Sequence, residues 1–208
     1  MDWFISDTHF GHRSLLKTER SEFNNTEEHD DYIVETINKY VKPTDRLYIL
    51  GDVGNFETLK RLNGYKILIQ GNHDNVTNKY AKQYVDEYYK NPIYYNRKVM
   101  LSHYPHPVPP HILNVHGHLH GAILDSKNHF NVSAAMIEYK PVNEKDLLTI
   151  VNTLPKERND FLYEWYADKY KFADTRKACN IIADENGLVK LKESRRKLAK
   201  DKAKKNKH

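Results

Sequence analysis

The 208-residue sequence lacks the features that mark several protein classes. Its single cysteine, Cys179, excludes a disulfide within the chain and is typical of a reducing compartment. No apolar stretch approaches the roughly 20 residues of a membrane span, no signal peptide fits before the first apolar run at Trp3, and there is no internal repeat. We therefore expect a cytoplasmic protein with no membrane partner, of a length that suits one domain with an appendage.

Most of the chain lacks a net positive charge, although the net charge of the whole is +5. Residues 190–208 contain ten Lys or Arg and two Asp or Glu, a net charge of +8, so the other 189 residues carry −3. A negatively charged body is unsuited to be a platform for nucleic acid, whereas the basic tail could hold a polyanion.

Hydrophobic patterns predict a β-α-β-α-β succession in the first 75 residues, which is typical of parallel strands joined by crossover helices. The expected strands are 3–6, 47–50 and 66–69, and the expected helices are 28–41, where Asn25 and Glu28 could form a capping pair, and 57–62.

Farther along, a tyrosine-rich helix is expected at 80–89. Strands without crossover helices follow and predict antiparallel or mixed pairing, at 93–95, 99–102, 112–115 and 130–133. A helix at 144–152 closes the compact part. An aromatic helix at 161–172 and a basic segment at 192–207 would follow it.

Residues suited to metal binding occur in five fragments, each at or close behind the end of an expected strand. The fragments are Asp7-Thr8-His9, Gly51-Asp52, Gly71-Asn72-His73-Asp74, His103 and Gly117-His118-Leu119-His120. Loops at the carboxyl ends of strands carry catalytic groups in α/β proteins, so these side chains should converge. Alternation in extended backbone would point Asp7 and His9 the same way, and likewise His118 and His120. Carboxylates with neutral imidazoles suit manganese, iron, zinc or nickel better than magnesium or calcium, so we expect two such divalent ions, manganese foremost, with Asp52 able to bridge them.

In their order, the five fragments resemble the motifs of the calcineurin-like metallophosphoesterases over about residues 1–150. The resemblance implies an α/β sandwich of two mixed β-sheets flanked by helices. Residues 1–154 would be the catalytic domain and 155–208 a C-terminal helical extension. It also implies two overlapping ligand sets, a first metal held by Asp7, His9, Asp52 and His120, and a second held by Asp52, Asn72, His103 and His118.

The same resemblance implies a mechanism in which a hydroxide between the two ions attacks phosphorus in line. His73 would face the leaving oxygen as general acid or phosphate clamp, because histidine transfers protons near neutral pH. Asp74 or Asn55 would orient His73. His12 and Arg13 could touch phosphate, although His12 could equally cap the next helix.

The second fragment departs from the family's common Gly-Asp-x-x-Asp-Arg-Gly pattern, because Asn55 replaces the second aspartate and no arginine follows. This argues against a phosphoprotein phosphatase and favours a phosphodiesterase acting on a nucleotide or a nucleic-acid end. One alternative is a nuclease or RNA-processing enzyme that holds nucleic acid with its basic tail. The other is a non-catalytic interaction module, which the complete ligand set disfavours. The remaining histidines are expected to be structural or at the surface.

Overall fold

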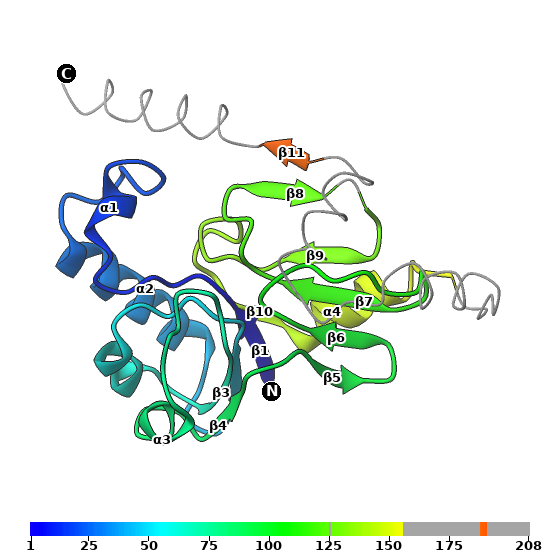
Figure 1. Cartoon of the computed structure of the whole chain (residues 1–208), viewed down its shortest axis with the longest axis horizontal. Coiled ribbons are helices and arrows are strands. Elements are labelled where there is room, and N and C mark those ends of the chain that lie inside the picture. The colour runs from blue at the N-terminus through cyan, green and yellow to red at the C-terminus, as the bar shows by residue number, and fades with distance from the viewer. Residues whose placement is uncertain (125, 156–187, 191–208) are drawn as a thin grey trace.

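The computed structural model describes residues 1–124, 126–155 and 188–190, and two β-sheets dominate it (Figure 1). The five-stranded sheet has the order β10-β1-β2-β3-β4, with β10 (Val142–Asn143), β1 (Asp2–Ile5), β2 (Arg46–Ile49), β3 (Tyr65–Ile69) and β4 (Glu87–Tyr89). The four-stranded sheet consists of β5 (Ile93–Asn96), β6 (Val99–Leu101), β7 (Leu113–His116) and β9 (His129–Asn131). A small sheet pairs β8 (Ala122–Leu124) with β11 (Leu188–Lys190).

Both main sheets are mixed, as expected. Strands β1 to β4 run parallel and β10 is antiparallel to β1, while β6, β7 and β9 run parallel and β5 is antiparallel to β6. The carboxyl ends of β1, β2 and β3 consequently meet at one edge, where the first three ligand-bearing fragments begin. Strands β8 and β10 have only three and two residues and were not predicted.

Alternating side chains of the central strands divide the interior into two cores. Trp3 and Ile5 of β1 pack into the core under the helices, whereas Phe4 between them packs into the core between the two sheets. Strands β2 and β3 follow the same alternation. Burial on both faces explains why these strands are almost continuously apolar, which made them easy to predict.

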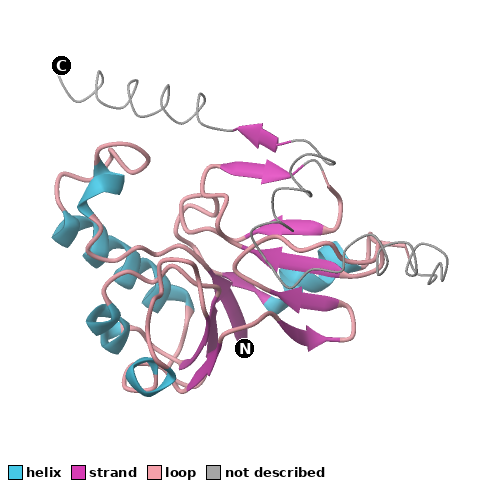
Figure 2. Cartoon of the chain, viewed as in Figure 1, coloured by secondary structure: helices cyan, strands magenta, loops and turns pink. Residues whose placement is uncertain are grey.

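Most helical segments gather on one side of the five-stranded sheet (Figure 2). They are α1 (Arg13–Leu16), α2 (Thr26–Tyr40), the 3-10 helix η1 (Phe56–Arg61) and α3 (Asn78–Ala81). The expected cap of α2 is confirmed, because the Asn25 side chain accepts a hydrogen bond from the Glu28 N–H at 2.8 Å. The fifth helix, α4 (Glu144–Val151), lies where a helix was expected and contributes Leu147 and Val151 to the inter-sheet core.

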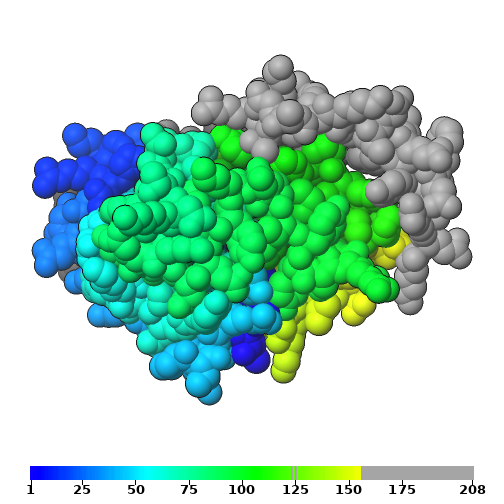
Figure 3. Space-filling model, turned by 60° about the horizontal axis from the view of Figure 1, so that its bottom comes forward, coloured from blue at the N-terminus to red at the C-terminus, as the bar shows by residue number. Residues whose placement is uncertain are grey.

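The tyrosine-rich helix expected at 80–89 is wrong. Helix α3 ends at Ala81, and residues 87–89 form the parallel strand β4 beside β3. Val85 and Tyr88 enter the core under the helices, and pairing with β3 decides the conformation because a four-residue helix has little stability of its own. In space-filling view, this green part of the chain packs directly against the blue and cyan N-terminal half (Figure 3).

The expected helix at 161–172 and the basic segment at 192–207 lie outside the described residues. The division of the chain at 154 and 155 therefore stays a prediction. Among the described residues, no helix is long and apolar enough to cross a membrane.

Candidate metal centre

The structure brings all seven expected ligand residues together at the carboxyl edge of the sheets. Ligand atoms of Asp7, His9, Asp52 and His120 lie within 4.8 Å of one another, and so do those of Asp52, His103 and His118. The Asn72 side-chain oxygen lies 2.8 Å from His103 Nε2 and 3.0 Å from His118 Nδ1, which adds it to the second group. Below, the first four residues are called the first cluster, and Asp52, Asn72, His103 and His118 the second cluster.

Asp52 is the residue that the two clusters share. Its Oδ2 lies 3.6 Å from His9 Nε2 and 3.5 Å from His103 Nε2, so this oxygen faces one imidazole of each cluster. Its other oxygen accepts the backbone N–H of His73 at 2.9 Å. Asp52 is buried, and a carboxylate between two sets of imidazoles can serve two cations at once.

The local backbone reaches these positions in an unexpected way. Five of the ligand residues have positive φ between 45° and 67°, namely Asp7, His9, Asp52, His118 and His120. Alternation in extended backbone, which was expected to point the two members of each pair the same way, is therefore wrong, although Asp7 and His9 do share the first cluster. His118 and His120 belong to different clusters. Non-glycine residues in the left-handed region are strained, and such strain concentrates at functional sites.

Two glycines allow the loops to approach this closely. A side chain at Gly71 would collide with the Asp52 carboxylate, and one at Gly117 would collide with the Asp7 carboxylate and the Ser6 hydroxyl. Close packing in the tertiary structure thus explains why glycine precedes the ligands in the third and fifth fragments, where a larger residue would not fit.

Hydrogen bonds on the outer side of the clusters direct free lone pairs inward. His103 Nδ1 donates a hydrogen bond to the Leu50 carbonyl at 2.8 Å, which fixes the ring so that Nε2 is the nitrogen that faces the second cluster. Asp7 Oδ2 accepts the His118 N–H at 2.9 Å and lies 2.7 Å from the Ser133 hydroxyl. Asp7 Oδ1 is buried and has no hydrogen-bond partner among the described residues.

His73 projects over the shared carboxylate without joining either cluster. Its Nε2 lies 4.0 Å from Asp52 Oδ2, and its side chain is 59% exposed. Its ring centroid is 5.6 Å from that of His9 and 6.2 Å from that of His12. His73 is therefore outside both clusters, and its role toward a substrate stays a prediction.

The expected orienting residues have other partners. The Asp74 carboxylate accepts backbone N–H groups of Gly71, Asp52 and Val53 at 2.8 to 2.9 Å, so it ties two ligand loops together. The Asn55 side chain caps η1 by accepting the Glu57 N–H. Orientation of His73 by a direct hydrogen bond from either residue is therefore wrong.

His12 and Arg13 both lie at the surface at the start of α1. His12 occupies the N-cap position but makes no capping hydrogen bond through its side chain, while its ring lies 5.3 Å from that of His9. His12 Nε2 also lies 3.2 Å from the Ser14 hydroxyl in the first turn of α1, and contact of His12 or Arg13 with phosphate stays a prediction.

Sequence reasoning missed three residues that support the site. Glu19 Oε2 lies 2.6 Å from His120 Nδ1. Buried Arg20 donates to the backbone carbonyls of Asp7 and Thr8. Ser133 ends an expected strand, so the strand-end rule could have found it, whereas no local pattern distinguished Glu19 or Arg20.

A profile of the calcineurin-like phosphoesterases matches residues 3–197. The chain belongs to this family. Among its relatives is the uncharacterized protein MJ1445 of Methanocaldococcus jannaschii, 33% identical over 161 residues that cover 68% of this chain and 85% of that protein.

One solved structure supports the fold. A protein of unknown function, AQ665 from Aquifex aeolicus, aligns at a TM-score of 0.58 with 29% identity, covering 72% of this chain and 98% of that one. A looser likeness, with a TM-score of 0.42 and 20% identity, is to the nuclease MPE of Pseudomonas putida and covers 57% of this chain and 61% of that one. A likeness this loose says nothing about activity here.

The donor set of this phosphoesterase fits a pair of divalent cations. Nε2 of His9 and Nε2 of His120 face each other at 3.1 Å, and the unpartnered Asp7 Oδ1 lies 3.5 Å from the latter. Two imidazole nitrogens and a carboxylate oxygen that converge this closely form a set of donors that suits a cation. Family membership and the two clusters indicate a dinuclear divalent metal site.

Burial and charge set the protonation of the clusters. Burial lowers the pKa of His9 to about 3 and that of His118 to about 4, so both imidazoles are neutral donors at pH 7. Burial would also lower the pKa of His120, but its ion pairs with Asp7 and Glu19 raise it to about 10. The 3.5 Å separation makes the Asp7 contact an ion pair rather than a hydrogen bond. Cation binding must therefore displace a proton from His120.

Proposed function

We propose that this calcineurin-like phosphoesterase is a phosphodiesterase that uses two divalent cations, manganese foremost, and acts on a nucleotide or a nucleic-acid end. The observation that carries the proposal is the Asp52 carboxylate, which faces imidazoles of both clusters with His73 beside it. A pair of cations there would lower the pKa of a bound water and offset charge on the phosphoryl oxygens.

The protein's own side chains divide the remaining work. The two clusters form a rigid floor because their ligands are hydrogen-bonded from behind and held on short loops. His73 lies above this floor within reach of a leaving oxygen, to which an imidazolium can donate a proton through Nε2. Because the His73 backbone N–H is fixed on Asp52, the ring and the shared carboxylate keep their relative position.

The charge around the site favours a diester over a monoester. A phosphomonoester is largely a dianion at neutral pH and benefits from a cationic side chain at the phosphate, as in the arginine-bearing motif of protein phosphatases. Here the residues after Asp52 are Val53, Gly54 and Asn55, and Asn55 faces η1. A diester carries a single negative charge, which the metals and His73 can accommodate.

Turnover of bis-p-nitrophenyl phosphate tests the proposal, with manganese, iron, zinc and nickel supplied in turn. We expect His73→Ala to lower the turnover number by about 10²- to 10⁴-fold for a dinucleotide, whose alkoxide leaving group needs a proton, while both cations still bind. The loss should be much smaller for bis-p-nitrophenyl phosphate, because p-nitrophenolate leaves without protonation. Asp52→Asn should lower the cation stoichiometry as well as the rate. His111→Ala, which alters a histidine outside both clusters, is the matched control.

Two results would contradict the proposal. A folded His73→Ala protein that hydrolyses a dinucleotide at wild-type rates would refute the role of His73. A protein that binds two cations but hydrolyses no diester with any of them would refute the phosphodiesterase itself.

A further inference from the structure

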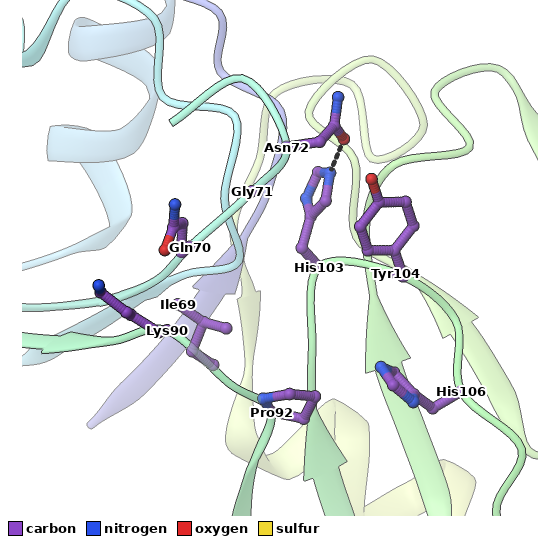
Figure 4. Close-up of a pocket in the computed structure, with 9 residues that line it drawn as sticks. All are labelled: Ile69, Gln70, Gly71, Asn72, Lys90, Pro92, His103, Tyr104 and His106. Atoms are coloured by element: carbon purple, nitrogen blue, oxygen red, sulfur yellow. Dashed lines mark hydrogen bonds between the residues drawn. The ribbon is translucent and has the colours of Figure 1, made fainter. Parts of the chain in front are cut away.

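A cavity of about 210 Å³ adjoins the second cluster (Figure 4). Asn72 and His103 of that cluster line one end of it, and Pro92, Tyr104, His106 and Lys90 are among its other lining residues. The cavity therefore begins where the second cation would be held and extends away from it between the loops that follow β3, β4 and β6.

The cavity and His73 lie on different sides of the shared carboxylate. His73 neighbours His9 and His12, which belong to or adjoin the first cluster, and it does not line the cavity. In an in-line displacement the leaving oxygen departs opposite the nucleophile, while the ester oxygen that stays on phosphorus points sideways. A diester with its leaving oxygen at His73 can thus direct its retained arm over the second cluster.

We propose that this cavity binds the retained arm of the substrate, and that the arm is a nucleoside carrying a further phosphate group. This inference rests on the proposed phosphodiesterase function. Such an arm is found both in a free nucleoside bisphosphate and at the end of a nucleic-acid strand.

The walls match the parts of such an arm. The Tyr104 ring packs against His118 with centroids 4.3 Å apart, which fixes it as a firm flat wall, and Pro92 adds an apolar surface. Polar and apolar groups share the lining about equally, which suits a ligand that has both a flat ring and hydroxyl or phosphate groups. The volume is too small for more than one compact group of this kind, so the second phosphate must reach the opening.

Two polar groups of the cavity await a partner. Lys90 is exposed and makes no hydrogen bond or ion pair with any described residue, so its ammonium is available to an anion. His106 Nε2 is shielded from solvent and is unpartnered within the described part of the chain. An unsatisfied buried nitrogen is costly, and a ligand hydroxyl or phosphate oxygen could relieve that cost after a small ring rotation. Burial lowers the pKa of His106, so the cationic partner for phosphate is Lys90.

Calorimetric binding to the full-length, manganese-loaded protein tests the inference with two probes that differ by one phosphate. Thymidine 3′,5′-bisphosphate should bind about fivefold more tightly than thymidine 5′-monophosphate, the gain expected from one ion pair at a partly exposed site. Lys90→Ala should abolish this difference. His106→Phe, which keeps the ring but removes its nitrogens, should weaken both probes equally. Lys145→Ala, on α4 and not part of the cavity, controls for a general effect of charge.

The inference is overturned if neither probe binds, if both bind equally well to the wild type, or if Lys90→Ala and Lys145→Ala have the same effect. Because binding needs no turnover, Lys90-dependent binding without hydrolysis of any diester would refute the phosphodiesterase and leave the cavity assignment standing. Hydrolysis of a diester by a protein that shows no Lys90-dependent preference for the bisphosphate would refute the cavity assignment and leave the phosphodiesterase standing. Displacement of the bisphosphate by a short oligothymidylate at lower concentration would identify a strand end as the source of the arm, and failure to compete would identify a free nucleotide.

Discussion

Replacing Glu19 with alanine tests how the first cluster is held in place. Glu19 contacts no expected metal position itself, but its Oε2 lies 2.6 Å from His120 Nδ1. Because a carboxylate accepts the Nδ1 proton, His120 presents Nε2 to Asp7 and His9. Glu19→Ala leaves the ligands in the chain and removes only the group that orients one of them.

Two opposed effects determine how much Glu19→Ala should change the metal affinity of the first cluster. Loss of a partner behind a metal-bound histidine typically weakens metal affinity by about 10- to 100-fold. Against this, a His120 pKa of about 10 means that a cation binding at pH 7 must displace a proton at a cost of about 4 kcal/mol. Without Glu19 that pKa falls and the cost shrinks. We therefore expect Glu19→Ala to bind the cation of the first cluster about tenfold more weakly than the wild type at pH 7. This loss of affinity should grow toward hundredfold as pH rises to 8.5.

Manganese titration by calorimetry under nitrogen, at both pH values, measures this effect. Two binding events should be resolved, and only the first-cluster event should weaken in Glu19→Ala. Glu19→Gln keeps an acceptor for the His120 Nδ1 proton and should lose less. Glu27→Ala, which removes an exposed carboxylate from the first turn of α2, is the control. Equal affinities of Glu19→Ala and the wild type at both pH values would refute the positioning role.

Three further changes test the packing around the clusters by urea unfolding. Arg20→Met removes the buried donors to the carbonyls of Asp7 and Thr8 and should lower the free energy of unfolding by about 1–3 kcal/mol. An unchanged midpoint would show that these contacts are dispensable. Asp74→Asn replaces a carboxylate that accepts three backbone N–H groups with an amide that cannot accept all three. The free energy of unfolding should fall by about 2–4 kcal/mol, and a loss under 1 kcal/mol would contradict the role of Asp74 in tying the two ligand loops together. Burial lowers the pKa of His116 to about 3, below the ordinary value of 6.5, so its contribution to stability is complete above pH 6.5 and is lost as pH falls toward 3. His116→Asn should therefore reduce the loss of stability between pH 7 and pH 5 by about 2 kcal/mol, and an identical pH dependence in both proteins would contradict this.

Local chemistry explains how much of the fold was predictable. Continuous apolar runs in β1, β2 and β3 have one stable placement, buried on both faces of a parallel sheet. The segment at 80–89 has no such constraint, because its tyrosines suit a helix and a strand alike. Only pairing with the exposed edge of β3 made it β4.

The sequence by itself determined the family and the set of ligand residues, because each ligand is the residue type that binds cations and stands in a short motif at the end of a strand. The resemblance also assigned these ligands to two sets, but only the tertiary structure decided the backbone conformation that brings them there. Positive φ angles separate His118 from His120 although one residue lies between them. It also decided what supports the ligands and what surrounds them, since Glu19 meets His120 across 101 residues, and the cavity beside Asn72 and His103 is assembled from separate loops. Contacts of such sequence separation depend on the packing of whole elements, and no local pattern encodes them.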